Sequence, residues 1–219
     1  MKKRISNYVR NHFKYFFSAC ILLGLLCLFT EYAYFKSTVP VMKNLTSTYG
    51  YSVIQYGESK YQDDLVRYAD IAFERIPEKL VNQFYADKGV LSFDSNDEYI
   101  SYDWSAGYMG FMDNGNVKIS VRSDIQTDNG TPFVICHEFG HYFDHVMDNP
   151  SQSKDWEDIT NEEYPKMIRN NKYYSDPKEY FAQSFAWYCY RNDILGEVNK
   201  KACPKTFEYI DNLVEFYNQ

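Results

Sequence analysis

The segment FVICHEFGHYFDH, from Phe133 to His145, holds three of the four histidines of the chain. On an α-helix, His137 and His141 are four residues apart and project from one face, so both imidazoles can bind a single Zn²⁺. The apolar residues around them predict a largely buried helix, and buried imidazoles beside a carboxylate need a partner such as a metal ion. The segment therefore predicts a zinc-binding helix. The alternative is a half-buried helix with histidines on its surface.

Glu138 has a different expected role from the two histidines. It is displaced by about 100° around the helix from His137, so its carboxylate can reach a water molecule at the metal more easily than the metal itself. A carboxylate in that place can take a proton from the water and pass it to a leaving amine. The motif thus predicts two ligands, His137 and His141, and one general base, Glu138.

The third ligand has several candidates. His145 continues the four-residue series, but three successive turns of a straight helix do not surround one ion, so we expect it at the surface or behind a ligand. Glu162 and Glu163 lie in TNEEYP, which we interpret as a short polar segment without an apolar stripe. Glu179 lies in SDPKEYFAQSFAWY, a segment typical of a buried helix capped by Ser175 or Asp176. Glu179 is the better candidate, although its spacing also fits a capping box.

Asp144 stands one turn beyond His141. It can orient a ligand imidazole through the second ring nitrogen, or it can be a solvated acid near the helix end. The sequence leaves both open.

Lysines and arginines precede an apolar run from about Tyr15 to Phe29. This order predicts a cytoplasmic N-terminus and an exported remainder. Cleavage after Ala33 would put Glu31 where a signal peptidase needs a small residue. We therefore expect residues 1–36 to form a cytoplasmic basic tail and an uncleaved transmembrane signal anchor. Residues 37–219 would then be an extracellular domain of a single-pass cell-membrane protein, the alternative being a cleaved signal peptide and a secreted domain.

The exported part is acidic. Taking the six basic residues and one acidic residue of positions 1–36 from the 23 and 30 of the whole chain leaves 17 against 29, a net charge of −12. Nucleic acid is therefore not an expected partner. The three cysteines there, Cys136, Cys189 and Cys203, permit one disulfide at most. Cys189 with Cys203 is the candidate pair, and buried unpaired thiols are the alternative.

The remaining pattern is typical of an α+β chain. Two amphipathic helices are predicted over residues 61–76 and 78–89, followed by a strand at Val90–Phe93 and a hairpin that turns at Asn114-Gly115. The zinc-binding helix follows from Thr131 to before Asn149. Two further helices are predicted over Pro177–Tyr190 and Pro204–Tyr217. We expect the strand at Lys118–Val121 to offer an edge to an extended substrate peptide.

Three ordered blocks carry a family resemblance: HEFGHYFDH, then EYFAQSF, then PKTFEYIDNLVEFY. Over roughly residues 105–219 the chain resembles the catalytic domain of anthrax toxin lethal factor and the small secreted Pro-Pro endopeptidases of the same peptidase group. The resemblance implies a zincin-like metallopeptidase domain, with a small twisted sheet, the HExxH helix and a helical C-terminal half.

The resemblance also implies roles. It assigns zinc to His137, His141 and Glu179, the proton transfers to Glu138, and oxyanion stabilisation to a tyrosine before Glu179. Tyr173 and Tyr174 are the candidates, slightly closer to Glu179 than the family pattern has it. A second departure is Gln183, where the family has a glutamate, so a hydrogen-bonding role remains but a charge does not.

Together these features predict a zinc-dependent endopeptidase that hydrolyses extracellular proteins or peptides. The expected partners are an extended peptide and, through the N-terminal helix, the membrane, and the protein is expected to be a monomer. The alternative is a zinc-binding cell-surface module with weak or lost catalysis.

Overall fold

The computed structural model describes five stretches of the chain, residues 42–56, 62–94, 107–122, 130–168 and 172–219. The chain divides into two compact units, residues 1–40 and 41–219. The anchor predicted over residues 1–36 lies outside the described residues. Among the helices of the described stretches, none combines the length and apolar character that crossing a membrane requires.

The second unit contains a five-stranded mixed sheet with the order β1-β2-β3-β5-β4. The strands β2, β3 and β5 pair in parallel, whereas each outer strand pairs with its neighbour in antiparallel fashion. The bounds are β1 Met42–Thr46, β2 Ser52–Tyr56, β3 Val90–Phe93, β4 Gly107–Phe111 and β5 Val117–Val121.

The strand expected at Val90–Phe93 and the hairpin around Asn114-Gly115 are confirmed, the latter as the β4–β5 pair. The edge expected at Lys118–Val121 is wrong. That segment is β5, which lies between β3 and β4, and its Val and Ile side chains are buried. The edge strand on this side of the sheet is β4.

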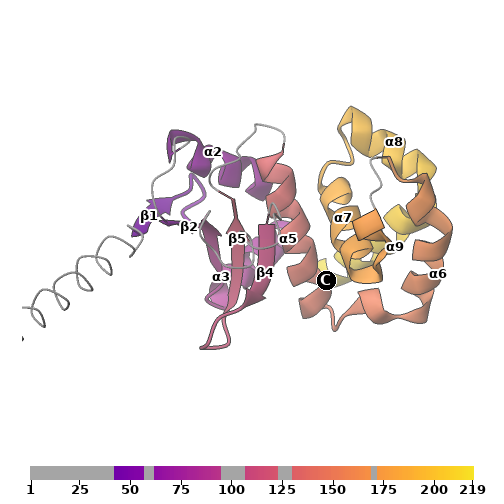
Figure 1. The fold of residues 1–219 in the computed structure, drawn as a ribbon, viewed down its shortest axis with the longest axis horizontal. Helices are drawn as coiled ribbons and strands as arrows, with labels where there is room; N and C mark the ends of the chain where they lie inside the picture. The colour runs from indigo at the N-terminus through magenta and orange to yellow at the C-terminus, as the bar shows by residue number, and fades with distance from the viewer. Residues whose placement is uncertain (1–41, 57–61, 95–106, 123–129, 169–171) are drawn as a thin grey trace, which may run out of the picture. The chain divides into compact units, whose positions relative to one another are not determined.

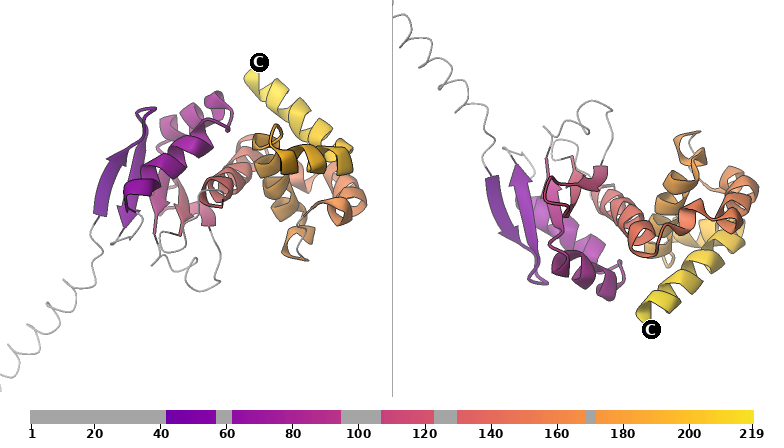
Figure 2. Two further views of the ribbon diagram at one scale, coloured as in Figure 1. Left: turned by 90° about the horizontal axis from the view of Figure 1, so that it is seen from above. Right: turned by 90° about the horizontal axis from the view of Figure 1, so that it is seen from below.

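Seven α-helices lie in the described residues, two before the last strands and five after them (Figure 1). Their bounds are α2 Gln62–Phe73, α3 Glu78–Ala86, α5 Thr131–Val146, α6 Lys154–Glu163, α7 Pro177–Cys189, α8 Ile194–Ala202 and α9 Pro204–Asn218. Figures 1 and 2 show α2 and α3 with the sheet, α6 to α9 gathered as a helical half, and α5 between the two. The α+β class and the helical C-terminal half are confirmed.

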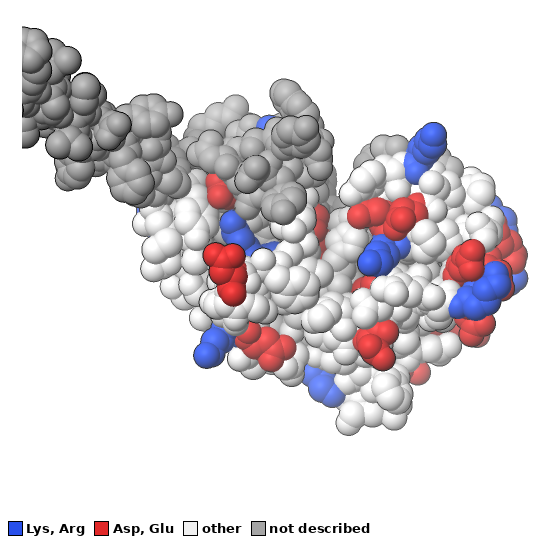
Figure 3. Space-filling model, turned by 60° about the horizontal axis from the view of Figure 1, so that its bottom comes forward, with Lys and Arg blue, Asp and Glu red and all other residues white. Residues whose placement is uncertain are grey.

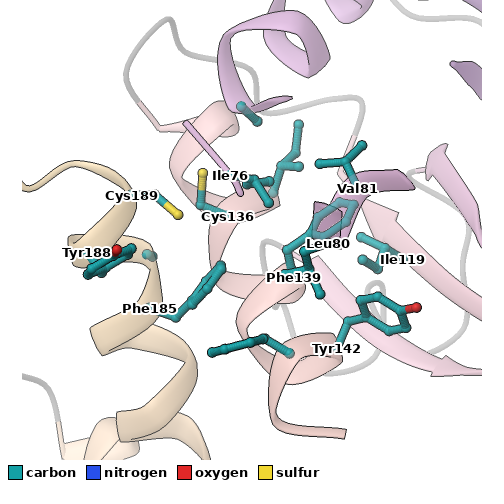
Figure 4. Close-up of a cluster of buried hydrophobic side chains, with 14 of the residues drawn as sticks. Ile76, Leu80, Val81, Ile119, Cys136, Phe139, Tyr142, Phe185, Tyr188 and Cys189 are labelled. Atoms are coloured by element: carbon teal, nitrogen blue, oxygen red, sulfur yellow. The ribbon is translucent and has the colours of Figure 1, made fainter. Parts of the chain in front are cut away.

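Helix α5 is buried on two sides because it touches both halves. It contacts α2, β4 and β5 on one side and α7 on the other. Figure 4 shows Phe139 and Tyr142 of α5 on the side of Leu80 and Ile119, while Phe185 of α7 approaches from the other side. Two apolar faces explain the dense apolar flanks of the HEFGH motif, since each face covers a different part of the core.

Candidate functional site

Helices α5 and α7 bring three possible metal ligands together. His137 and His141 project from α5 and Glu179 projects from the first turn of α7. Glu179 Oε2 lies 3.3 Å from His137 Nε2, and Glu179 Oε1 lies 3.6 Å from His141 Nε2. One ligand atom from each residue fits into a cluster in which all separations are within 4.8 Å.

This cluster has the size that a zinc ion needs. Tetrahedral ligands at about 2.0–2.1 Å from zinc are separated by about 3.3–3.4 Å from one another, close to the two measured contacts. Within the described part of the chain, Glu179 Oε2 is a buried acceptor without a hydrogen-bond donor, although His137 Nε2 lies 3.3 Å away. A cation would satisfy that oxygen. Two imidazoles and one carboxylate form a donor set that suits zinc, so the residues present fit the ion.

The start of α7 explains why Glu179 is available. Asp176 is the N-cap, and its carboxylate accepts hydrogen bonds from the backbone N–H groups of Lys178 and Glu179. Pro177 occupies the first helical position, as expected. The cap is thus provided by Asp176, and the side chain of Glu179 turns toward the two histidines instead of back to the helix start.

Glu179 and His141 shift each other's pKa values toward the charged forms. Burial raises the pKa of Glu179, but the neighbouring His137 and His141 lower it more strongly, so the carboxylate stays ionised. Burial lowers the pKa of His141, while Glu179, Glu138 and Asp144 raise it by more. A concentration of negative charge around two imidazoles favours a cation between them.

Glu138 lies beside the cluster and is only 5% exposed. Burial raises the pKa of its carboxyl group above the ordinary value, and the two neighbouring histidines partly oppose this. Edge strand β4 approaches the carboxylate closely at Gly107. A Cβ atom on Gly107 would lie 2.7 Å from Glu138 Oε1 and 2.7 Å from a methyl carbon of Val134. No sequence motif marks Gly107, yet its lack of a side chain leaves room for the Glu138 carboxylate.

Gln183 contacts the ring nitrogen of His137 that does not face Glu179. Its side-chain oxygen lies 3.2 Å from His137 Nδ1, which leaves Nε2 to face Glu179. A contact of this kind fixes the orientation of a metal-binding imidazole.

Neither interpretation of Asp144 is correct, because its buried carboxylate accepts hydrogen bonds from the backbone N–H and hydroxyl of Ser151 and so closes the turn after α5.

Glu162 and Glu163 lie away from the cluster, at the end of helix α6. The interpretation of TNEEYP as a short polar segment is wrong, since most of it belongs to α6, which buries Trp156, Thr160 and Glu163. The Glu163 carboxylate accepts hydrogen bonds from the backbone N–H of Lys205 and from both N–H and hydroxyl of Thr206. It therefore caps the N-terminus of α9.

The two candidate tyrosines differ in their surroundings. Tyr173 is 60% exposed, and its hydroxyl neighbours Glu179. Burial of the hydroxyl and the nearby charge of Glu179 raise its pKa. Tyr174 is half-buried, with its ring 5.9 Å from the ring of His137. The two rings contact each other at 5.5 Å. Tyr173 thus presents its hydroxyl at the cluster, whereas Tyr174 packs beside a histidine.

His145 is exposed, as expected, and does not join the cluster. Its ring lies 5.1 Å from the exposed ring of Phe111 at the end of β4. Strand β4 therefore runs along α5 from Gly107 beside Glu138 to Phe111 beside His145.

The crossing of α5 and α7 is unusually close at Gly140. A Cβ atom on Gly140 would lie 2.7 Å from Ala182 Cα and 2.9 Å from the Ala182 carbonyl oxygen. Gly140 stands between His137 and His141, and Ala182 is one turn after Glu179. Small residues at this point allow the helices to approach until the ligands from both can meet.

The expected Cys189–Cys203 disulfide is wrong. Cys136, Cys189 and Cys203 are all free and buried. The thiol of Cys203 donates to the carbonyl oxygen of Glu163 at 3.4 Å, whereas Cys189 lies against Cys136. The alternative of buried unpaired thiols is the one found.

The surface charges are mixed on the face shown in Figure 3. There Lys and Arg stand singly or beside Asp and Glu, and the coloured residues show no broad basic patch. Among the described residues, Lys154 pairs with Asp158 and Lys205 with Glu162. This distribution agrees with the net negative charge and offers no track for a phosphate backbone on that face.

Comparison with known proteins places the chain in a family. The family model for the N- and C-terminal domain of anthrax toxin lethal factor matches residues 46–213. The Pro-Pro endopeptidase of Clostridioides difficile (strain 630) is 35% identical over 80 residues, which is 36% of this chain and 36% of that relative. The match thus spans about a third of the length of the relative.

The fold is also similar to a solved structure. The Pro-Pro endopeptidase PPEP-2 from Paenibacillus alvei superposes with a TM-score of 0.57 at 19% identity, covering 74% of this chain and 96% of that one. The family match extends over well more than half of the chain and includes both α5 and α7. The chain therefore belongs to the anthrax toxin lethal factor domain family, as the three sequence blocks indicated.

Proposed function

We propose that this protein is a zinc-dependent endopeptidase that hydrolyses extended peptides or proteins outside the cell. The observation that carries the proposal is the convergence of His137, His141 and Glu179 beside the buried carboxylate of Glu138. Membership of the lethal factor family and similarity to proteins named Pro-Pro endopeptidases support a peptidase.

His137, His141 and Glu179 would hold the zinc ion, which when bound supplies a Lewis acid for water and for the scissile carbonyl. Glu138 accepts the proton of the attacking water and gives it to the leaving amine, a task suited to a carboxylate whose pKa burial has raised. Gln183 keeps His137 in one orientation. The Tyr173 hydroxyl donates a hydrogen bond to the developing oxyanion, since it is exposed and adjacent to Glu179.

An extended substrate would lie along β4. This strand is the sheet edge on the side of α5, and its backbone passes from Gly107, beside the base, to Phe111. Backbone groups of an edge strand can pair with a peptide regardless of its side chains. The names of the two relatives make a bond between two prolines the first sequence to test.

The test uses the full-length chain and its Glu138→Gln variant. Both are measured for zinc content and for cleavage of a peptide library that includes Pro-Pro sequences. We expect about one zinc per chain in both proteins, and cleavage by the unaltered protein alone, because the substitution removes the base and keeps the ligands. The loss of turnover should be at least about 100-fold.

The outcomes separate the alternatives. Zinc in both proteins without cleavage by either would support a zinc-binding surface module with lost catalysis. Equal cleavage by both would show that Glu138 is not the base. Absence of zinc from the purified unaltered protein after exposure to zinc would contradict the proposed zinc site and with it the proposed zinc-dependent activity.

A further inference from the structure

Two buried cysteine side chains lie at the interface of the two helices that carry the candidate metal ligands. Cys136 is the residue before His137 on α5, and Cys189 is the last residue of α7. Figure 4 shows the two side chains next to each other at the interface of α5 and α7, with the Cys189 sulfur directed toward Cys136. After burial, the neighbouring Cys189 is the next cause that raises the pKa of the Cys136 thiol. Cys136 is 0% exposed and Cys189 is 7% exposed.

The third described cysteine does not compete for this contact. Cys203 starts the last helix, and its thiol donates to the carbonyl oxygen of Glu163. Beside the Cys136–Cys189 pair lie Phe185 and Tyr188 of α7 and Ile76, which shield it from solvent. The pair is therefore positioned by packing, and a disulfide would require the two sulfur atoms to approach to a bond length of about 2.05 Å.

We propose that Cys136 and Cys189 form a disulfide that joins α5 to α7 when the protein meets a disulfide oxidant. In the first step, the Cys189 sulfur attacks a low-molecular-weight disulfide, forms a mixed disulfide and releases one thiol. In the second step, the Cys136 sulfur attacks the Cys189 sulfur and displaces the second thiol. Two cysteine S–H groups are thereby oxidised to one S–S bond, and one external disulfide is reduced to two thiols, which take the two protons.

The order of the steps follows from exposure. Cys189 is the more accessible sulfur and stands at the end of its helix, where local opening is easier than in the middle of α5. Cys136 then needs no access to solvent, since its partner is already beside it.

The bond would close a loop that contains the whole candidate metal centre. His137, His141 and Glu179 all lie between Cys136 and Cys189 in the sequence. A link between α5 and α7 opposes the separation of these helices, and that separation is required for the two histidines to leave Glu179. Oxidation should therefore stabilise the fold and slow the loss of a bound zinc ion.

The experiment uses the full chain carrying Cys20→Ser and Cys27→Ser, so that three thiols remain. The protein is incubated with oxidised glutathione, the remaining thiols are alkylated, and linked peptides are identified by mass spectrometry. We expect the loss of two of the three thiols and a linked peptide pair that contains Cys136 and Cys189. The midpoint of thermal unfolding should rise by roughly 5–10 °C and return after reduction.

Matched variants test the assignment. Cys203→Ser should still form the bond, whereas Cys189→Ser and Cys136→Ser should lose both the linked peptides and the rise in unfolding temperature. With zinc bound, release of the ion to a chelator should be at least about twofold slower after oxidation, and only in proteins that contain the Cys136–Cys189 pair.

Three results would overturn the inference: a bond that includes Cys203, stable glutathione adducts without an internal bond, or three free thiols after prolonged exposure to the oxidant. A bond between Cys136 and Cys189 that does not slow zinc release would contradict its effect on the metal centre. None of these readouts depends on peptide cleavage, so failure of the proposed enzymatic function would be seen separately.

Discussion

Glu179 and Glu163 stand on the neighbouring helices α7 and α6, yet their surroundings give them different roles. Glu179 has two imidazoles beside it and one buried oxygen without a donor among the described residues. Glu163 is 1% exposed and accepts three hydrogen bonds at the start of α9. One carboxylate thus needs a cation, and the other has all the partners that it needs.

Replacing the two glutamates separates these roles. Glu179→Ala should lower zinc affinity by more than the roughly 10–100-fold typical of losing an outer partner of a ligand, because it leaves only two imidazoles. Glu163→Ala should keep stoichiometric zinc but lose about 2–3 kcal/mol of stability. Zinc titration and thermal unfolding of both variants provide the measurement. Loss of zinc from Glu163→Ala with full retention in Glu179→Ala would reverse the assignment of the third ligand.

The two tyrosines provide a second test at this scale. Tyr173→Phe removes a hydroxyl that lies at Glu179, so kcat should fall about 10²–10³-fold with zinc affinity little changed. Tyr174→Phe should have a smaller effect, because that side chain packs with its ring beside His137. Steady-state kinetics on a cleaved peptide, with zinc content measured in parallel, compares them. A larger loss of kcat in Tyr174→Phe would exchange their roles.

Residues that act through local spacing could be predicted from the sequence. His137, Glu138 and His141 share one helix, and Glu179 follows a cap that the sequence displays. Gly107 could not be found in this way. Its proximity to Glu138 depends on strand β4 lying against α5, a contact between segments far apart in the sequence.

At the scale of elements, the distance between α5 and α7 determines whether a metal centre can form. Gly140 faces the backbone of Ala182. His141 is the next residue on α5, while His137 and Glu179 each stand about one turn before the contact on their own helix. Gly140→Ala would place a methyl group 2.7 Å from Ala182 Cα, so the helices must move apart by several tenths of an ångström. Because a zinc site tolerates deviations of about 0.2 Å, zinc affinity should fall about 10-fold or more.

The measurement for Gly140→Ala is a zinc titration with a competing chelator. Glu163→Ala is the matched control, since it also destabilises the fold but leaves the helix crossing unchanged. If both variants lose zinc affinity equally, general destabilisation is the cause and the crossing has no specific role. Unchanged zinc affinity in Gly140→Ala would show that the helices can adjust without moving the ligands.

Most elements of the domain follow from local patterns, and the missed ones lack such patterns. Strand β3, the β4–β5 hairpin and helices α2, α3, α5, α7 and α9 are marked by apolar periodicity or turn residues. Helix α6 is polar except for a narrow buried stripe with Trp156, and α8 leaves Ile194, Leu195 and Val198 exposed. Strands β1 and β2 have no counterpart among the elements expected from the sequence. The strand order depends on long-range pairing, and so the wrong edge was assigned.

At the scale of the whole molecule, the second unit contains every residue assigned to the candidate site, and the first unit coincides with the basic and apolar N-terminal sequence. The run from about Tyr15 to Phe29 follows several basic residues, an order that is typical of segments whose N-terminus stays in the cytoplasm. We propose that this segment stays attached and holds the domain at the outer face of the membrane. An endopeptidase held there would act on peptides and proteins close to the cell surface.

This proposal predicts where the full-length chain is found in cells. It should sediment with membranes, resist extraction by high salt and be released by detergent, because apolar contacts rather than charges hold it. Protease added outside intact cells should remove the domain from about residue 40 onward, since the orientation places it outside. Replacing Lys2, Lys3 and Arg4 by Glu is the control, because loss of the basic flank should reduce protection of the N-terminus. A soluble mature protein beginning near Tyr34 would instead show a cleaved signal peptide and a secreted domain.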